Sequence, residues 1–173
     1  MSLKKYESEI RYSGSSDVQV YSVLSDLSIL KRLEHALENA ELRELLAAKA
    51  GKENVEKAQK ALHDMEATTD SVTFEAPMVG KVTLQIVERE QPKLIKVEAK
   101  GLPVDTCLWI QILPTETGSK IKVTAGAELN FFIKGIADQY LPTGVNNLAG
   151  ILASLPYDKL QGGTGGTAQQ KQA

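Results

Sequence analysis

Between Thr69 and Leu129 the sequence alternates apolar and polar residues in five successive runs, and this pattern constrains the fold more than any other feature. Strict alternation is typical of β-strands that bury one face. The apolar rows are Val72, Phe74 and Ala76; Val82, Leu84 and Ile86; Ile95, Val97 and Ala99; Leu108, Ile110 and Ile112; and Ile121, Val123, Ala125, Ala127 and Leu129. Because short links with Gly or Pro separate the runs, the sequence predicts an antiparallel meander.

One further strand is predicted over Lys4–Tyr12, where Tyr6, Ser8, Ile10 and Tyr12 share one side. This brings the expected sheet to about six strands. The rows on the opposite face of the sheet are mostly charged and suit a solvated surface. The run 105–113 differs, because its outward row contains Cys107 and the chain's only tryptophan, Trp109. Either a neighbouring element such as a helical insert shields this ring, or the ring forms an interface patch.

A change of period after the first strand predicts helices. Ser15, Ser16 or Asp17 can cap a short helix that ends near Asp26. From Leu27 to Met65 the sequence is highly charged, with apolar residues at helical spacing, and predicts two or three amphipathic helices with a break at Gly51. This insert is interpreted as a helical cap on one end of the sheet, with a movable lid as the alternative.

The stretch Asn130–Tyr157 predicts one long helix whose only charged residues are Lys134 and Asp138. Asn130 is its expected N-cap, and Pro142 is expected to bend it. The remainder, 161–173, is rich in Gly and Gln and is predicted to be disordered. The chain is therefore expected to form a single domain over residues 1–160, with the helical insert at about 27–66.

Composition excludes several classes of function. The chain has 173 residues, with Lys+Arg 20 against Asp+Glu 22 and a net charge of -2. Its basic residues are scattered, which argues against nucleic-acid binding. The single cysteine excludes an internal disulfide framework, and the N-terminal residues contain no apolar stretch suited to a signal peptide or membrane span. We therefore expect a cytoplasmic protein without a membrane span.

Five features of the sequence are distinctive together: VYSVLSD at 20–26, GKVTLQIVERE at 80–90, LWIQILP at 108–114, GSKIKVTAGAEL at 118–129 and the uncharged terminal helix. In these features the chain resembles the START-like (SRPBCC) superfamily, which includes the birch-pollen-allergen proteins, polyketide cyclase/dehydrase-like proteins and lipid-transfer domains. The resemblance covers about Lys4 to Tyr157 and is strongest to small bacterial members without an assigned role. It implies an α+β helix-grip fold, in which a curved antiparallel sheet wraps the C-terminal helix and leaves a cavity. The chain departs from this superfamily in two ways that concern the cavity mouth. Its insert is longer than usual, and about six strands are expected here where the fullest members have seven.

The inward rows contain no Asp, Glu, His, Lys or Arg among the positions given above, and their tyrosines are poor bases at an ordinary pKa near 10. We therefore assign no catalytic residue and no cofactor. His35 and His63 lie in the insert without a zinc motif, and no metal site is expected. On the terminal helix, Asn146 and Asn147 either donate to a bound carbonyl or face water.

These observations predict binding or transport of a small hydrophobic molecule of the lipid, polyketide or isoprenoid class, between the sheet and the terminal helix. The predicted ligand-binding residues are Tyr6, Tyr12, Phe74, Leu84, Val97, Ile110, Val123, Ala125, Ile136, Tyr140 and Leu148. One alternative is a cyclase- or dehydratase-like enzyme that uses tyrosine hydroxyls. Another is an interaction module with a filled core, whose terminal helix or Trp109 patch contacts another chain, including a second copy in a homodimer.

Overall fold

The computed structural model describes residues 3–76 and 79–161, and the structural statements below concern this part of the chain. The strands are β1 (Leu3–Glu7), β2 (Arg11–Ser13), β3 (Glu66–Ala67), β4 (Ser71–Ala76), β5 (Gly80–Glu90), β6 (Leu94–Lys100), β7 (Thr106–Thr115) and β8 (Gly118–Glu128). The helices are α1 (Asp17–Leu24), α2 (Ile29–Ala36), α3 (Ala40–Ala50), α4 (Lys52–Asp64), α5 (Phe131–Ser154) and α6 (Tyr157–Gln161). The predicted α+β class is confirmed.

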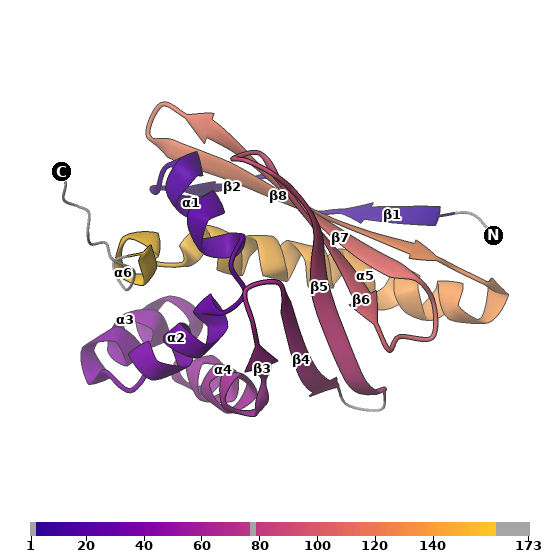
Figure 1. Cartoon of the computed structure of the whole chain (residues 1–173), viewed down its shortest axis with the longest axis horizontal. Helices are drawn as coiled ribbons and strands as arrows, with labels where there is room; N and C mark the ends of the chain where they lie inside the picture. The colour runs from indigo at the N-terminus through magenta and orange to yellow at the C-terminus, as the bar shows by residue number, and fades with distance from the viewer. Residues whose placement is uncertain (1–2, 77–78, 162–173) are drawn as a thin grey trace.

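A single antiparallel sheet organises the molecule, with the strand order β1-β8-β7-β6-β5-β4-β3 and with β2 also paired to β8. The sheet is strongly twisted and curved (Figure 1). Strands β4 to β8 form the predicted meander, and the predicted apolar rows align across it; Ile110, for example, lies opposite both Ile95 and Val123. The first strand, β1, pairs with the last one, β8, and forms one edge of the open sheet.

The sheet has eight strands where the sequence predicted about six. One of the two additional strands is the short β3, and the other arises because the predicted strand Lys4–Tyr12 is split. Glu7 lies opposite Thr124 and Arg11 lies opposite Ile121, so residues 8–10 occupy the space of two residues of β8. Such a β-bulge moves all later side chains to the other face of the sheet. Arg11 therefore lies on the inward side, while Tyr12 turns outward.

The predicted helix boundaries rest on local capping signals, and most of them are confirmed. Ser16 begins α1 with a capping box, because its side chain accepts from the Gln19 backbone N–H while the Gln19 side chain binds back. Gly51 separates α3 from α4 with a φ of 94°, a conformation that favours glycine. Asn130 caps α5 by accepting from the N–H groups of Phe132 and Ile133, each at 3.0 Å.

The terminal helix ends at Ser154, earlier than predicted, and α5 runs through Pro142 without a break. Leu155 is extended because it precedes Pro156, and α6 then starts at Tyr157. The predicted disordered tail lies, apart from Gln161, outside the described residues.

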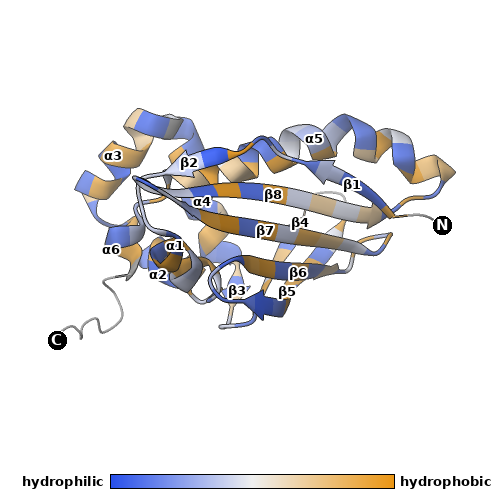
Figure 2. Cartoon of the chain, turned by 90° about the horizontal axis from the view of Figure 1, so that it is seen from above, coloured by the Kyte–Doolittle hydropathy of each residue, from blue (hydrophilic) through white to orange (hydrophobic). Residues whose placement is uncertain are grey.

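The main core fills the concave side of the sheet. It combines inward residues of β5 to β8 with side chains of α1, α5 and α6, such as Val20, Val145 and Tyr157. Helix α5 packs along the side of the sheet formed by β8, β1 and β2 (Figures 1 and 2). This helix turns Ala137, Val145, Ala149 and Leu152 inward.

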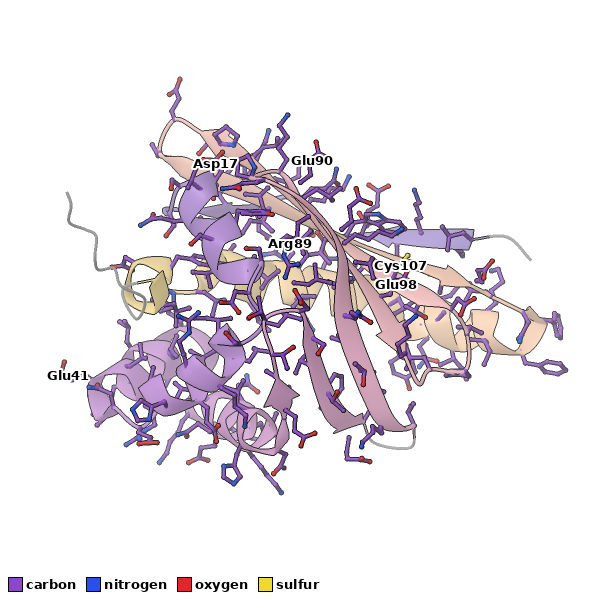
Figure 3. All side chains as sticks on the ribbon, viewed as in Figure 1. Asp17, Glu41, Arg89, Glu90, Glu98 and Cys107 are labelled. Atoms are coloured by element: carbon purple, nitrogen blue, oxygen red, sulfur yellow. The ribbon has the colours of Figure 1, made fainter. Side chains whose placement is uncertain are left out.

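The helical insert, α2 to α4, has a small core of its own around Leu37, Val55 and Leu62. Its two ends are held together at the sheet by Arg89 of β5, which Figure 3 shows beside the end of α1. The Arg89 guanidinium donates to the carbonyl oxygen of Ser25 at 2.8 Å, to that of Thr69 at 3.2 Å and to Asp70 Oδ1 at 2.8 Å. The Leu27 N–H also donates to Thr69 O, so the chain leaves and rejoins the sheet at one point.

Candidate functional site

The predicted ligand-binding residues fall into three groups in the structure. Tyr6, Val97, Ile110, Val123 and Ala125 are buried on the concave side, and Phe74, Leu84 and Leu148 are half-buried there. Tyr12, Ile136 and Tyr140 are exposed at 70%, 58% and 63%, so their predicted inward placement is wrong. The bulge turns Tyr12 outward. Ile136 and Tyr140 lie beside the stripe of α5 that faces the sheet, and they are therefore exposed.

Tyr6 belongs to a charged cluster that joins β1 to the N-terminal half of α5. Asp138 Oδ1 accepts from the Tyr6 hydroxyl and from Lys4 Nζ, each at 2.6 Å, and Asp138 Oδ2 accepts from Lys134 Nζ at 2.7 Å. Lys4 shares the inward parity of Tyr6, which the sequence reasoning overlooked. Together these four residues form the β1–α5 clamp.

The protonation behaviour of the β1–α5 clamp suits a structural role. Burial and the hydrogen bond to Asp138 raise the pKa of Tyr6 to about 12. Hydrogen bonds from Lys134, Lys4 and Tyr6 hold the pKa of Asp138 well below its usual range, and the bond to Asp138 raises the pKa of Lys4. Each shift moves its group further from neutral pH, whereas acid–base catalysis needs a pKa near the working pH. The three shifted groups therefore keep one protonation state near neutral pH, which suits a clamp that positions α5.

Replacing Asp138 with asparagine should make the free energy of unfolding depend less on pH in the acidic range. A carboxylate whose folded pKa is depressed adds stability that is present above its unfolded pKa, near 4, and is lost as the pH falls through the folded pKa. We expect the difference in unfolding free energy between wild type and Asp138→Asn to decrease as the pH is lowered from about 5 to about 2. Urea titrations across this range measure it, with Glu75→Gln, an exposed carboxylate of β4, as control. A gap independent of pH would contradict the role of the ionised carboxylate.

A groove of about 730 Å³ lies between the C-terminal half of α5 and the helical insert. We call it the helix groove. It is lined by Asn146, Asn147, Gly150, Ile151 and Ser154 of α5, the adjoining Leu155, Leu46, Lys49 and Asn54 of the insert, and Arg11 of β2. Apolar and hydrogen-bonding side chains thus face one space.

Arg11 reaches the helix groove because of the bulge. Its guanidinium lies over the α5 backbone at Gly150, where a Cβ atom would be 3.9 Å from Arg11 Nη1. The Arg11 Nε atom is buried and has no hydrogen-bond partner among the described residues. A buried donor without an acceptor is unusual in folded proteins and needs an explanation.

Asn146 connects the same bulge to α5. Its Oδ1 accepts from the Glu9 backbone N–H at 2.7 Å. Because that backbone group can only donate, the amide orientation is fixed and the Asn146 NH₂ group remains a donor for the groove. Asn146 and Asn147, which the sequence singled out as possible donors, both line the groove. Among its described lining residues there is no Asp or Glu.

Trp109 and Cys107 lie on the outer face of the sheet. The Trp109 ring covers Gly126, and the Nζ atoms of Lys5 and Lys96 lie 5.0 and 5.5 Å from its centroid. Two lysines, and not the insert, therefore shield the ring. Cys107 pairs with Glu98 on the neighbouring strand (Figure 3), and burial raises the pKa of its thiol. A raised pKa disfavours the nucleophilic thiolate.

Within the described ranges, no group of three or more His, Cys, Asp or Glu residues is arranged to hold a metal ion. No described helix has the length and apolar character needed to cross a membrane.

A scan against protein-family models and a search of curated proteins find no match for the chain. Among solved structures it is similar to norcoclaurine synthase from Thalictrum flavum, with a TM-score of 0.59 at 15% sequence identity, covering 92% of this chain and 87% of that one. The chain has the START-like helix-grip fold.

Two further structures share the helix-grip fold with this chain. A point mutant of the Thalictrum flavum synthase in complex with a transition state analogue matches with a TM-score of 0.55 at 12% identity, covering 92% of this chain and 97% of that one. The same synthase in complex with dopamine and hydroxybenzaldehyde matches with a TM-score of 0.54 at 15% identity, covering 86% and 84%. At such identities the likeness shows the fold alone.

Proposed function

We propose that the protein binds a small molecule with a large apolar part, of the lipid, polyketide or isoprenoid class, in the helix groove. The observation that carries the proposal is the lining of this groove: Leu46, Ile151 and Leu155 provide apolar contact beside the amides of Asn146 and Asn147. Small-molecule sites typically combine an apolar wall with a few polar groups that fix orientation. The proposed location is beside α5 and the insert, whereas the sequence predicted a cavity between α5 and the sheet.

Two further points support binding at this place. The volume of about 730 Å³ lies within the range of about 300–1,000 Å³ that is usual for small-molecule pockets. The fold is also one that takes up small organic molecules in another protein, since the norcoclaurine synthase structure holds dopamine and hydroxybenzaldehyde. The insert, which forms one wall of the groove, would then act as part of the binding site.

The enzymatic alternative relied on Tyr6, Tyr12 or Tyr140 polarising a carbonyl next to an asparagine. Tyr12 and Tyr140 are exposed, and the Tyr6 hydroxyl already donates to Asp138. None of these hydroxyls lines the helix groove. The geometry therefore supports binding over catalysis.

Replacing Ile151 with serine should weaken binding of a neutral apolar probe, N-phenyl-1-naphthylamine, by about tenfold. The reason is that the substitution removes most of one apolar side chain from the wall, which corresponds to about 1.4 kcal/mol. Fluorescence titration measures the affinity, and native mass spectrometry of the purified protein tests for a retained ligand.

Ile136→Ser is the matched control, because Ile136 lies on the same helix with the same exposure, 58%, outside the groove. We expect it to change the affinity by less than about twofold. Absence of saturable probe binding to the unchanged protein, or equal weakening by both substitutions, would rule out the helix groove as the site.

A further inference from the structure

We infer that the ligand of the helix groove carries a carboxylate, held by Arg11 and the Asn146 amide, while its apolar part lies along Ile151 and Leu155. This inference rests on the proposed function and specifies the ligand as an amphipathic carboxylic acid.

The first argument is the state of the Arg11 side chain. Arg11 lines the groove, and an arginine in a folded protein is always charged. Its Nε atom is buried without an acceptor among the described residues, so the protein does not satisfy the guanidinium fully. A carboxylate in the groove accepts from the terminal nitrogens of the guanidinium through two parallel hydrogen bonds, a match in geometry as well as charge.

The second argument is the charge balance around Arg11. Lys49 of the insert lines the same groove, and the described lining contains no acidic residue to neutralise either cation. The Asn146 NH₂ group adds a neutral donor whose direction is fixed by the Glu9 N–H. Two cations and one amide donor, with no acidic residue among the described lining, therefore favour an anionic ligand.

The third argument is the order of side chains along α5. Asn146 and Gly150, where the Arg11 guanidinium lies, are one turn apart, and Ile151 and Leu155 follow toward the helix end. The distance from Gly150 to Leu155 is roughly 7 Å along the helix axis. Leu46 faces this region from the insert. A ligand whose polar head lies near Asn146 and whose apolar chain runs toward Leu155 therefore matches the order of side chains along α5.

The test compares laurate with dodecanol, which has the same chain length and no charge, by isothermal titration calorimetry on the unchanged protein. We expect laurate to bind about 30-fold more tightly, because the charge-assisted bonds are present only for the carboxylate. Arg11→Gln should weaken laurate binding by about 30-fold and leave dodecanol binding within about twofold. Tyr12→Gln is the control, since this neighbouring side chain on β2 points away from the groove and is 70% exposed.

The outcomes separate the two proposals. Equal affinity for laurate and dodecanol in the unchanged protein, or equal weakening of both ligands by Arg11→Gln, would overturn the carboxylate assignment and leave the binding function standing. Tighter binding of dodecyl phosphate than of laurate would also overturn it, in favour of another anionic head group. Failure of both laurate and dodecanol to bind would count against the proposed function itself. The comparison of ligands on the unchanged protein needs no variant, so it remains decisive if Arg11→Gln folds poorly.

Discussion

Gly101→Ala is expected to lower the free energy of unfolding by at least about 3 kcal/mol. Gly101 follows β6 with a φ of 95°, where alanine is strained. A Cβ atom at this position would also lie 2.3 Å from the backbone oxygen of Lys81, which is part of the adjacent strand and cannot rotate away. Urea denaturation followed by circular dichroism measures the loss.

Gly80→Ala is a closely matched control for the effect of the contact. Gly80 has a φ of 98°, but a Cβ atom there would meet no described atom within 4 Å. This substitution should therefore cost only the conformational strain, about 1 kcal/mol. Equal losses in the two variants would show that strand β5 shifts freely to accommodate a side chain at Gly101, contrary to the close packing described.

Tyr157→Ala should cost about 4 kcal/mol of stability, because it empties a large site in the main core. Tyr157 is completely buried in the cluster that α1, α5, α6 and the sheet share. Its hydroxyl donates to the carbonyl oxygen of Leu152 at 2.5 Å, which closes the turn between α5 and α6. Burial raises the pKa of this phenol, so it remains a neutral donor in the folded protein. Thermal and urea unfolding both measure the change.

Two other tyrosine variants serve as comparisons, one for the loss of the hydroxyl alone and one for the loss of an exposed ring. Tyr157→Phe keeps the ring and leaves the Leu152 carbonyl without its donor, which should cost about 1–2 kcal/mol. Tyr140→Ala removes a ring that is 63% exposed on α5 and should change stability by less than about 0.5 kcal/mol. If Tyr157→Ala were as mild as Tyr140→Ala, α6 would not be an integral part of the core.

The elements set by local signals were predictable from the sequence. The meander follows from alternation and Gly or Pro links, and the helix starts capped by Ser16 and Asn130 can be recognised from neighbouring residues. Gly51 marks a helix break through its own backbone preference. In all these cases the residues that cause the structure lie next to it in the chain.

The bulge at residues 8–10 was not predictable, because it is defined by what lies opposite. The run Lys4–Tyr12 alternates without interruption, and only the register with β8 reveals the additional residue. One inserted residue exchanged the places of Arg11 and Tyr12, which removed one predicted ligand residue and brought Arg11 into the helix groove. Lys4 is different, since its parity with Tyr6 was visible in the sequence and was overlooked.

The orientation of α5 was ambiguous for a related reason. A surface helix usually marks its outer side with charge, and α5 has only Lys134 and Asp138, which pair with each other. Apolar residues therefore occur on its covered and uncovered sides alike: Phe131 and Phe132 are 88% and 83% exposed at one end of the helix (Figure 2), while Ala149 is fully buried. The prediction that this outer side contacts a second copy of the chain stays a prediction.

The pairing of β1 with β8 has a consequence for how the protein is made. Leu3 lies opposite Glu128, so β1 has no partner until almost the whole sheet has been synthesised. At about 5–20 residues per second, this delay is on the order of ten seconds. During that time β4 to β7 can pair with their sequence neighbours, whereas Tyr6 and the bulge remain unpaired. The β1–α5 clamp and the Arg11 wall of the helix groove can therefore form only after α5 has been synthesised.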